Sequence, residues 1–169
     1  MGLFDFLKKK TVEKNEKSIQ QTSKNTDINE DENEFAIEIS ANAKSFREKH
    51  KERYQGLDFS VKSLIVLDQL LEDVSDFYED MDDAQQQNIV SKAGAYIFEV
   101  AKQNYGGKFF WYDNLNQPIL VAGQPEFEIS LLAFEKVKGR LENGYEDNIP
   151  FFFQGFIEGF NSKKTAMIV

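Results

Sequence analysis

Large apolar side chains are concentrated in one part of this chain of 169 residues. Residues 34–169 hold 14 of the 16 Phe, all six Tyr and the only Trp, whereas residues 1–33 are poor in such side chains beyond position 7. A segment of this size can bury roughly two-thirds of its unfolded surface. We therefore expect a flexible tail over residues 1–33 and a single folded domain over residues 34–169.

The composition excludes several classes of functional site. The chain has no Cys, which excludes disulfides, thiolate zinc sites and cysteine nucleophiles. His50 is the only histidine, so a multi-histidine metal site is excluded and a Ser-His-Asp triad would depend on this residue alone. His50 lies in a run of charged residues, and we expect it to be exposed to solvent.

The sequence also has no motif that is typical of a common enzyme class. It contains no nucleophile elbow, no phosphate-binding loop and no dinucleotide-binding glycine pattern. We therefore predict no catalytic residue, no metal site and no cofactor, and we favour a protein that is not an enzyme.

The charge is divided unevenly along the chain. Residues 1–24 carry six Lys and three acidic residues, a net charge of +3, whereas residues 25–169 carry 14 basic and 26 acidic residues, a net charge of −12. An acidic domain argues against nucleic-acid binding, which needs a basic face. It favours a protein partner with a basic surface.

Residues 1–10 have the pattern of an interfacial anchor, in which apolar side chains line one side of a short helix and lysines follow. The docking candidates are Leu3, Phe4, Phe6, Leu7, Lys8, Lys9 and Lys10. The apolar part is too short for a stable helix in isolation. Three possibilities therefore remain: docking on an anionic membrane, docking on a partner, or a tail that contacts nothing. Residues 11–33 are polar, and we expect a disordered linker there.

No apolar run approaches the ~20 residues that a membrane-spanning helix requires. The N-terminus also lacks the pattern of a secretory signal, because its lysines follow the apolar residues. We therefore expect a cytoplasmic protein, with a peripheral location at the inner face of the membrane as the alternative.

Apolar residues recur at steps of three and four over five stretches, which predicts amphipathic helices. These stretches are residues 34–54, 60–75, 83–105, 130–142 and 150–160. Ser60 is the predicted N-cap of the second helix. Gly94 lies inside the third helix, where a glycine costs up to ~1 kcal/mol and suggests close approach of another helix.

The periodicity changes after residue 107. Residues 108–113 and 118–123 are strand-like and are separated by turn residues, so they predict a hairpin, and Phe127 and Ile129 begin a third strand. The last residues are expected to fray. The predicted fold class is α+β, mainly helical, with four to five helices and a small antiparallel β-hairpin or three-stranded sheet.

Seven acidic residues lie between positions 72 and 83. Their spacing does not match a calcium-binding loop, because the alternating aspartates, the central glycine and the terminal glutamate are missing. We interpret this segment as a solvated connection that also caps the helix starting near residue 83.

Two segments together resemble a loose set of small bacterial domains of unknown function. These are LDFSVKSLIVLD at residues 57–68 and GAYIFEVAKQNYGGKFFW at residues 94–111. The corresponding patterns are L-D-[FY]-S-x-x-S-L-x-x-L-D and G-A-Y-x-x-E-V-x-x-x-N-x-G-G-x-W, and here the spacing from Gly107 to Trp111 is longer. The resemblance covers roughly residues 57–160. It implies a small bacterial α+β domain and no activity that can be transferred.

The second segment also contains the candidate ligand-binding residues. Glu99 shares a helix face with Tyr96 and Gln103, and a hairpin folded back over that helix would enclose a cleft. The candidates are Tyr96, Glu99, Asn104 and Trp111. The alternative is that Tyr96 and Trp111 belong to the core and Glu99 is paired.

Three hypotheses for function follow. The first is a non-enzymatic protein-interaction module of the adaptor or immunity type. The second is a peripheral membrane protein that is tethered by residues 1–10. The third is an enzyme that uses Glu99 as acid or base. Catalysis needs a second positioned group, and the sequence does not identify one.

The many aromatic residues of 109–112 and 151–160 are either core or a partly exposed docking patch.

Overall fold

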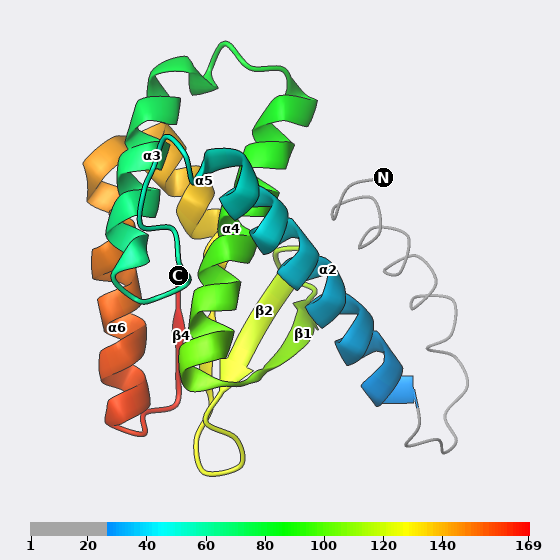
Figure 1. The fold of residues 1–169 in the computed structure, drawn as a ribbon. Coiled ribbons are helices and arrows are strands. Elements are labelled where there is room, and N and C mark those ends of the chain that lie inside the picture. Colours follow the sequence, from blue (N-terminus) through cyan, green and yellow to red (C-terminus); the bar gives the residue numbers. More distant parts are fainter. Residues whose placement is uncertain (1–26) are drawn as a thin grey trace.

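The structure, a computed structural model, describes residues 27–169 (Figure 1). The anchor pattern of residues 1–10 and the predicted linker over residues 11–26 lie outside the described residues.

The described chain forms five α-helices, one 3₁₀ helix and a four-stranded sheet. In order, these are α2 (Asp27–His50), α3 (Ser63–Tyr78), α4 (Asp83–Tyr105), β1 (Lys108–Tyr112), β2 (Gln117–Ala122), β3 (Ile129–Leu131), α5 (Ala133–Asn143), η1 (Gly144–Asp147), α6 (Ile149–Asn161) and β4 (Ala166–Ile168). The predicted fold class, α+β and mainly helical, is confirmed.

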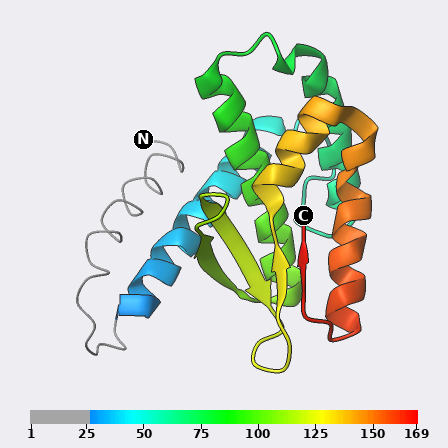
Figure 2. The ribbon, with the colours of Figure 1, turned by 180° about the vertical axis from the view of Figure 1, so that it is seen from behind.

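The strand order in the sheet is β1-β2-β3-β4, and only the β3–β4 pair is parallel. Figure 2 shows the sheet from the side opposite to helices α2 and α4, which lie across the hairpin. Two ring contacts mark this interface, from Phe98 of α4 to Phe109 (5.5 Å between centroids) and from Phe35 of α2 to Trp111 (6.2 Å). The hairpin thus closes one side of the helical core.

The C-terminus differs from the prediction. Residues 166–168 form β4 instead of fraying, because they pair with β3 through a register that sets Ile129 opposite Ala166 and Leu131 opposite Ile168. The chain turns back after α6 and runs along the sheet edge, as the red strand in Figure 1 shows.

Helix α2 is longer at its start and shorter at its end than predicted. It begins at Asp27, so the predicted linker is wrong for residues 27–33. It ends at His50, and the N–H groups of Arg53 and Tyr54 then both donate to the His50 carbonyl in a turn. The last apolar position of the predicted helix, Tyr54, therefore belongs to the connection to α3.

Two other helices start three residues later than predicted. Ser60 lies before α3 in a hydrogen-bonded turn, where its hydroxyl oxygen accepts from the Ser63 N–H at 3.3 Å. Helix α5 starts at Ala133 because residues 129–131 pair as β3. By contrast, α4 has the predicted bounds, and its N-cap Asp82 forms a capping box with Gln85.

None of the helices in the described range is both long and apolar enough to cross a lipid bilayer.

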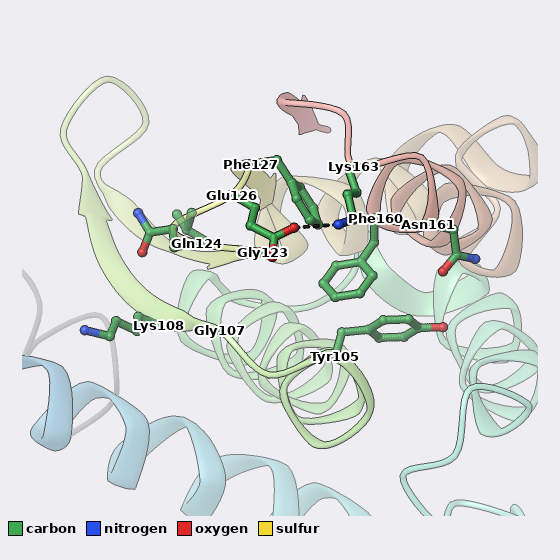
Figure 3. Close-up of a pocket in the computed structure, with 11 residues that line it drawn as sticks. Tyr105, Gly107, Lys108, Gly123, Gln124, Glu126, Phe127, Phe160, Asn161 and Lys163 are labelled. Carbon is green, nitrogen blue, oxygen red and sulfur yellow. Dashed lines mark hydrogen bonds and ion pairs between the residues drawn. The ribbon is translucent and has the colours of Figure 1, made fainter.

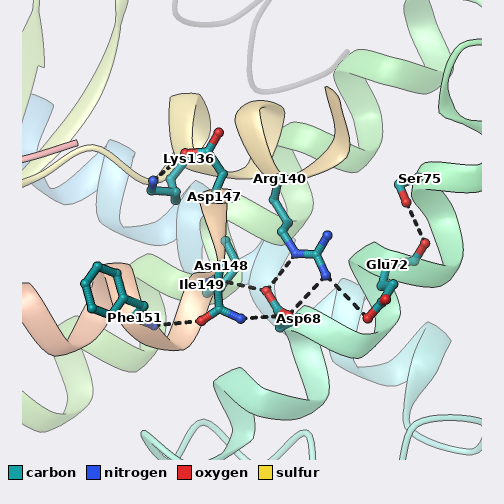
Figure 4. Close-up of polar contacts among 9 residues, drawn as sticks. All are labelled: Asp68, Glu72, Ser75, Lys136, Arg140, Asp147, Asn148, Ile149 and Phe151. Atoms are coloured by element: carbon teal, nitrogen blue, oxygen red, sulfur yellow. Dashed lines mark hydrogen bonds and ion pairs between the residues drawn. The ribbon is translucent and has the colours of Figure 1, made fainter. Parts of the chain in front are cut away.

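A buried carboxylate joins three of the helices (Figure 4). Asp68 of α3 accepts from Arg140 of α5 through Nε at 2.9 Å and Nη2 at 3.2 Å. It also accepts from the Asn148 side chain at 3.2 Å and from the Ile149 N–H at 2.9 Å, at the start of α6. Arg140 is 2% exposed, and its hydrogen bonds to Asp68 raise its pKa. The last residue of the first motif therefore holds α5 and α6 against α3.

Gly94 permits α5 to approach α4, as its position in the sequence predicted. A Cβ at this position would overlap the ring of Phe134 and come within 3.4 Å of the Phe134 Cα. We therefore expect Gly94→Ala to lower the free energy of unfolding by about 1–3 kcal/mol, despite the higher helix propensity of Ala. Urea unfolding followed by circular dichroism measures this change.

Gly155 provides the matched control, because it lies within α6 and a Cβ there meets nothing within 4 Å. We expect Gly155→Ala to raise the free energy of unfolding by about 0.5–1 kcal/mol. Equal effects of the two substitutions would contradict the packing described for Gly94.

Candidate functional site

The first candidate residue, Tyr96, connects the two motif segments. It is fully buried on α4, and its hydroxyl donates to Ser63 Oγ at 2.7 Å and accepts from the Phe59 N–H at 3.1 Å. Burial raises the pKa of the Tyr96 hydroxyl. Phe59 has a φ of +63°, so this hydrogen bond helps to hold an unusual backbone conformation. Tyr96 thus fixes the segment that leads into α3.

Asn104 has a related role at the end of α4. Its side-chain amide donates to the Phe59 carbonyl at 3.2 Å and to the Val100 carbonyl at 2.8 Å.

Glu99 is 9% exposed, and it accepts from Gln103 Nε2 at 2.7 Å. The predicted neighbourhood of Glu99 and Gln103 on one helix face is therefore present, with the two side chains bonded to each other.

Trp111 lies on β1, where its ring stacks on Phe35 of α2 with an interplanar angle of 17°. Its indole Nε1 is buried, and no partner for it lies among the described residues. Tyr96, Glu99, Asn104 and Trp111 do not line one cleft, because Tyr96 and Asn104 bond to the segment before α3 whereas Trp111 packs against α2. None of the four lines any of the cavities described below.

The largest described cavity lies where α4, the β2–β3 loop and α6 end (Figure 3). Its volume is about 740 Å³. Three aromatic side chains contribute to its wall: Tyr105 from α4, Phe127 from the loop and Phe160 from α6. Tyr105 and Phe127 both contact the Phe160 ring edge-on, with centroid distances of 5.1 and 5.3 Å. We call this cavity the aromatic pocket.

Polar groups form the rim of the aromatic pocket. The charged ones are Lys108 and the ion pair between Glu126 and Lys163, and the amide side chains are Gln124 and Asn161. The bond from Lys163 lowers the pKa of the exposed Glu126 carboxyl, which therefore stays ionised. Among the described lining residues, Glu126 is the only carboxylate. This rim can orient a bound group, but it offers no paired acid and base.

Two glycines permit the backbone turns at this pocket. Gly107 has a φ of +111°, and a Cβ there would lie 2.7 Å from the Val121 carbonyl oxygen. Gly123 also has a positive φ, +91°, and a Cβ there would overlap the Phe127 ring. Of the pocket residues, the sequence indicated Gly107 within a motif, Phe127 at the start of a strand, and Phe160 among the aromatic residues that form either core or a docking patch. None of the three was predicted to bind a small ligand. The adjacent glycines Gly106 and Gly107 are the sequence feature that indicates a sharp backbone turn at this place.

A smaller cavity of about 280 Å³ lies between α4, α5 and the hairpin turn. Gln117 lines it and is 2% exposed, and both polar atoms of its amide are buried without a hydrogen-bond partner among the described residues. The sequence predicts that Gln117 lies in the hairpin turn, whereas it is the first residue of β2. Within the described part of the chain, no group of three or more His, Asp or Glu side chains is arranged to hold a metal ion.

No protein-family model matches this chain, and neither a curated protein nor a solved structure does.

The unpartnered amide of Gln117 predicts a change in stability. Gln117→Leu replaces buried polar atoms by apolar atoms of similar shape, so we expect the free energy of unfolding to rise by about 1 kcal/mol. Chemical denaturation measures this change. Gln86→Leu is the matched control, because the Gln86 amide lines the same cavity and donates to the Tyr78 carbonyl at 2.8 Å. A loss of stability in Gln117→Leu as large as in Gln86→Leu would show that the Gln117 amide is satisfied.

Proposed function

We propose that this chain is a non-enzymatic protein-interaction module of the bacterial cytoplasm, of the adaptor or immunity type, and that its aromatic pocket receives a side chain of the partner. One observation carries the proposal. The pocket combines an aromatic wall with a polar rim whose only carboxylate is already ion-paired. Such a site is suited to binding, because a few polar groups orient the occupant while apolar contacts supply affinity.

The size and lining of the pocket favour an anchor side chain. Binding energy in protein interfaces is concentrated in a few residues, often aromatic or Arg, that fill well-packed pockets. The rings of Tyr105, Phe127 and Phe160 offer edges and faces to such a side chain. The amides of Gln124 and Asn161 provide donors and acceptors at the entrance.

The charge of the domain favours a basic partner. Residues 25–169 carry 26 acidic and 14 basic residues. A net charge of this size accelerates encounter with a positively charged surface, and the acceleration weakens as the salt concentration rises. The partner is therefore a basic protein, whose anchor side chain enters the aromatic pocket.

The enzyme hypothesis has weaker support. Glu99 is hydrogen-bonded to Gln103 and lies away from the described cavities. The pattern in residues 1–10 keeps peripheral membrane tethering as the alternative, and that segment lies outside the described residues.

Asn161→Trp tests the proposed pocket. Asn161 is exposed at the rim, at the end of α6, and an indole there would block the entrance without removing a core side chain. The tagged chain is purified from its own host at low salt, the recovered partner is identified, and its affinity is measured with purified proteins. We expect Asn161→Trp to weaken binding at least about tenfold, which corresponds to about 1.4 kcal/mol.

Gln154→Trp is the matched control, because Gln154 is an exposed neutral residue on the same helix and lines none of the described cavities. It should bind the partner as the unmodified chain does. Recovery of no partner at low salt would contradict the interaction module. Equal binding by both tryptophan variants would refute the aromatic pocket as its site.

A further inference from the structure

A second cavity, of about 500 Å³, lies between the end of α2, the end of α3 and the start of α4. Its apolar part consists of Phe46, Val74, Met81 and Ile89, of which Phe46 is 1% exposed and the others are half-buried. We call it the cationic pocket, because three basic residues, Lys49, His50 and Lys92, also line it. Its volume lies within the ~300–1,000 Å³ that is typical of small-molecule sites.

The basic side chains of this pocket have no acidic partner within the described part of the chain. The neighbouring cations are paired: Arg47 and Lys51 with Glu48, and Arg53 with Asp73. By contrast, no ion pair involves Lys49, His50 or Lys92 among the described residues, although the domain has an excess of acidic residues. Two lysines and a histidine that gather around an apolar cavity form a site for an anion.

One carboxylate, that of Asp82, also lines the cavity. It accepts from the Gln85 N–H at 2.8 Å as the N-cap of α4, and no ion pair among the described residues joins it to Lys49, His50 or Lys92. The first turn of α4, which includes Ala84 and Gln85, also borders the cavity. The Asp82 carboxylate caps this helix N-terminus and offsets its partial positive charge, so the lysines are the source of the positive potential.

His50 differs from the sequence expectation, because it is half-buried instead of exposed. Its ring packs against Phe46, with 4.7 Å between centroids, and lies 6.4 Å from the ring of Tyr54. Burial is the main cause that lowers the pKa of His50, and the charges of Lys49, Lys92 and Arg53 lower it further. The imidazole is therefore predominantly neutral at neutral pH, and an anion beside it would favour its protonation.

We propose that the cationic pocket binds a small amphiphilic anion, a carboxylate with a hydrocarbon chain, whose head group lies among Lys49, His50 and Lys92 and whose chain covers Phe46, Val74, Met81 and Ile89. The basic part of the cavity matches the carboxylate of this ligand, and the apolar part matches its hydrocarbon chain. A bare anion would leave the apolar surface exposed, and a neutral hydrocarbon would leave the cations unpaired. This site is separate from the aromatic pocket and shares no lining residue with it.

Octanoate is the probe. 1-Octanol is the control that lacks the negative charge, and acetate is the control that lacks the hydrocarbon chain. Binding to the full chain is measured by calorimetry and by NMR shifts of the backbone amides. We expect octanoate to bind at least about tenfold more tightly than either control. The shifted amides should lie in residues 46–50 and 81–92.

Lys49→Gln and Lys92→Gln test the head-group contacts. Each should weaken octanoate binding about tenfold, as expected for loss of a hydrogen bond to a charged group. Lys44→Gln is the matched control, because Lys44 is exposed on α2 and lines none of the described cavities. Circular dichroism verifies that each variant is folded.

The titration of His50 provides an independent readout. Bound octanoate should raise the pKa of His50, so by linkage the affinity for octanoate should increase as the pH falls through that pKa. The charged groups around the imidazole are Lys49, Lys92 and Arg53, together with Asp82 in the same cavity lining. The proposal is overturned by equal affinity for octanoate and octanol, by equal affinity for octanoate and acetate, or by lysine variants that bind as the unmodified chain does.

Discussion

The bond between Asp68 and Arg140 is the interaction on which the arrangement of the C-terminal half depends. Asp68 lies on α3, Arg140 lies 72 positions later on α5, and the same carboxylate accepts from the first N–H of α6. Both side chains are almost fully buried. Without Arg140 the buried Asp68 carboxylate has no counter-charge, and without Asp68 the Arg140 guanidinium keeps only a 3.5 Å contact with the exposed Glu72. Breaking such a buried pair costs about 3–5 kcal/mol. The pair therefore fixes the positions of α5 and α6 relative to α3.

The two proposed binding sites depend on this framework in different ways. Helix α6 supplies Phe160 and Asn161 to the aromatic pocket, and Lys163 follows shortly after this helix. The cationic pocket is formed at the other end of α4, where α2 and α3 end. Tyr96 and Asn104 hold the segment before α3 to α4, so these two motif residues serve the scaffold between the sites.

The sequence predicted features that depend on local periodicity. The bounds of α4, the hairpin pairing and the close approach at Gly94 follow from neighbouring residues, and the structure confirms each of them. Strand β4 was missed because three residues have too little periodicity, and its pairing with β3 joins segments 37 positions apart. The surroundings of His50 were missed for a related reason. Its charged neighbours in sequence predicted exposure, whereas Phe46, one helical turn earlier, covers its ring.

The sequence could not predict the two pockets, because the residues that line each pocket come from separate segments. The aromatic pocket joins Tyr105, Phe127 and Phe160, three rings that each look like core residues in their own segment. The sequence suggested Glu99 as a candidate because it is a carboxylate on an apolar helix. In the structure its carboxylate accepts a hydrogen bond from the Gln103 amide one turn later. Sites of this kind arise where several elements end, and only the tertiary structure brings those ends together.

A double-mutant cycle on Asp68 and Arg140 tests the central claim most directly. The free energy of unfolding is measured in urea for the unmodified chain, Asp68→Leu, Arg140→Met and the double variant. We expect each single substitution to cost about 3–5 kcal/mol and the double variant to cost clearly less than their sum, with a coupling of about 2 kcal/mol or more. Additive effects, or a cost below about 1 kcal/mol for each single substitution, would show that the fold does not depend on this pair.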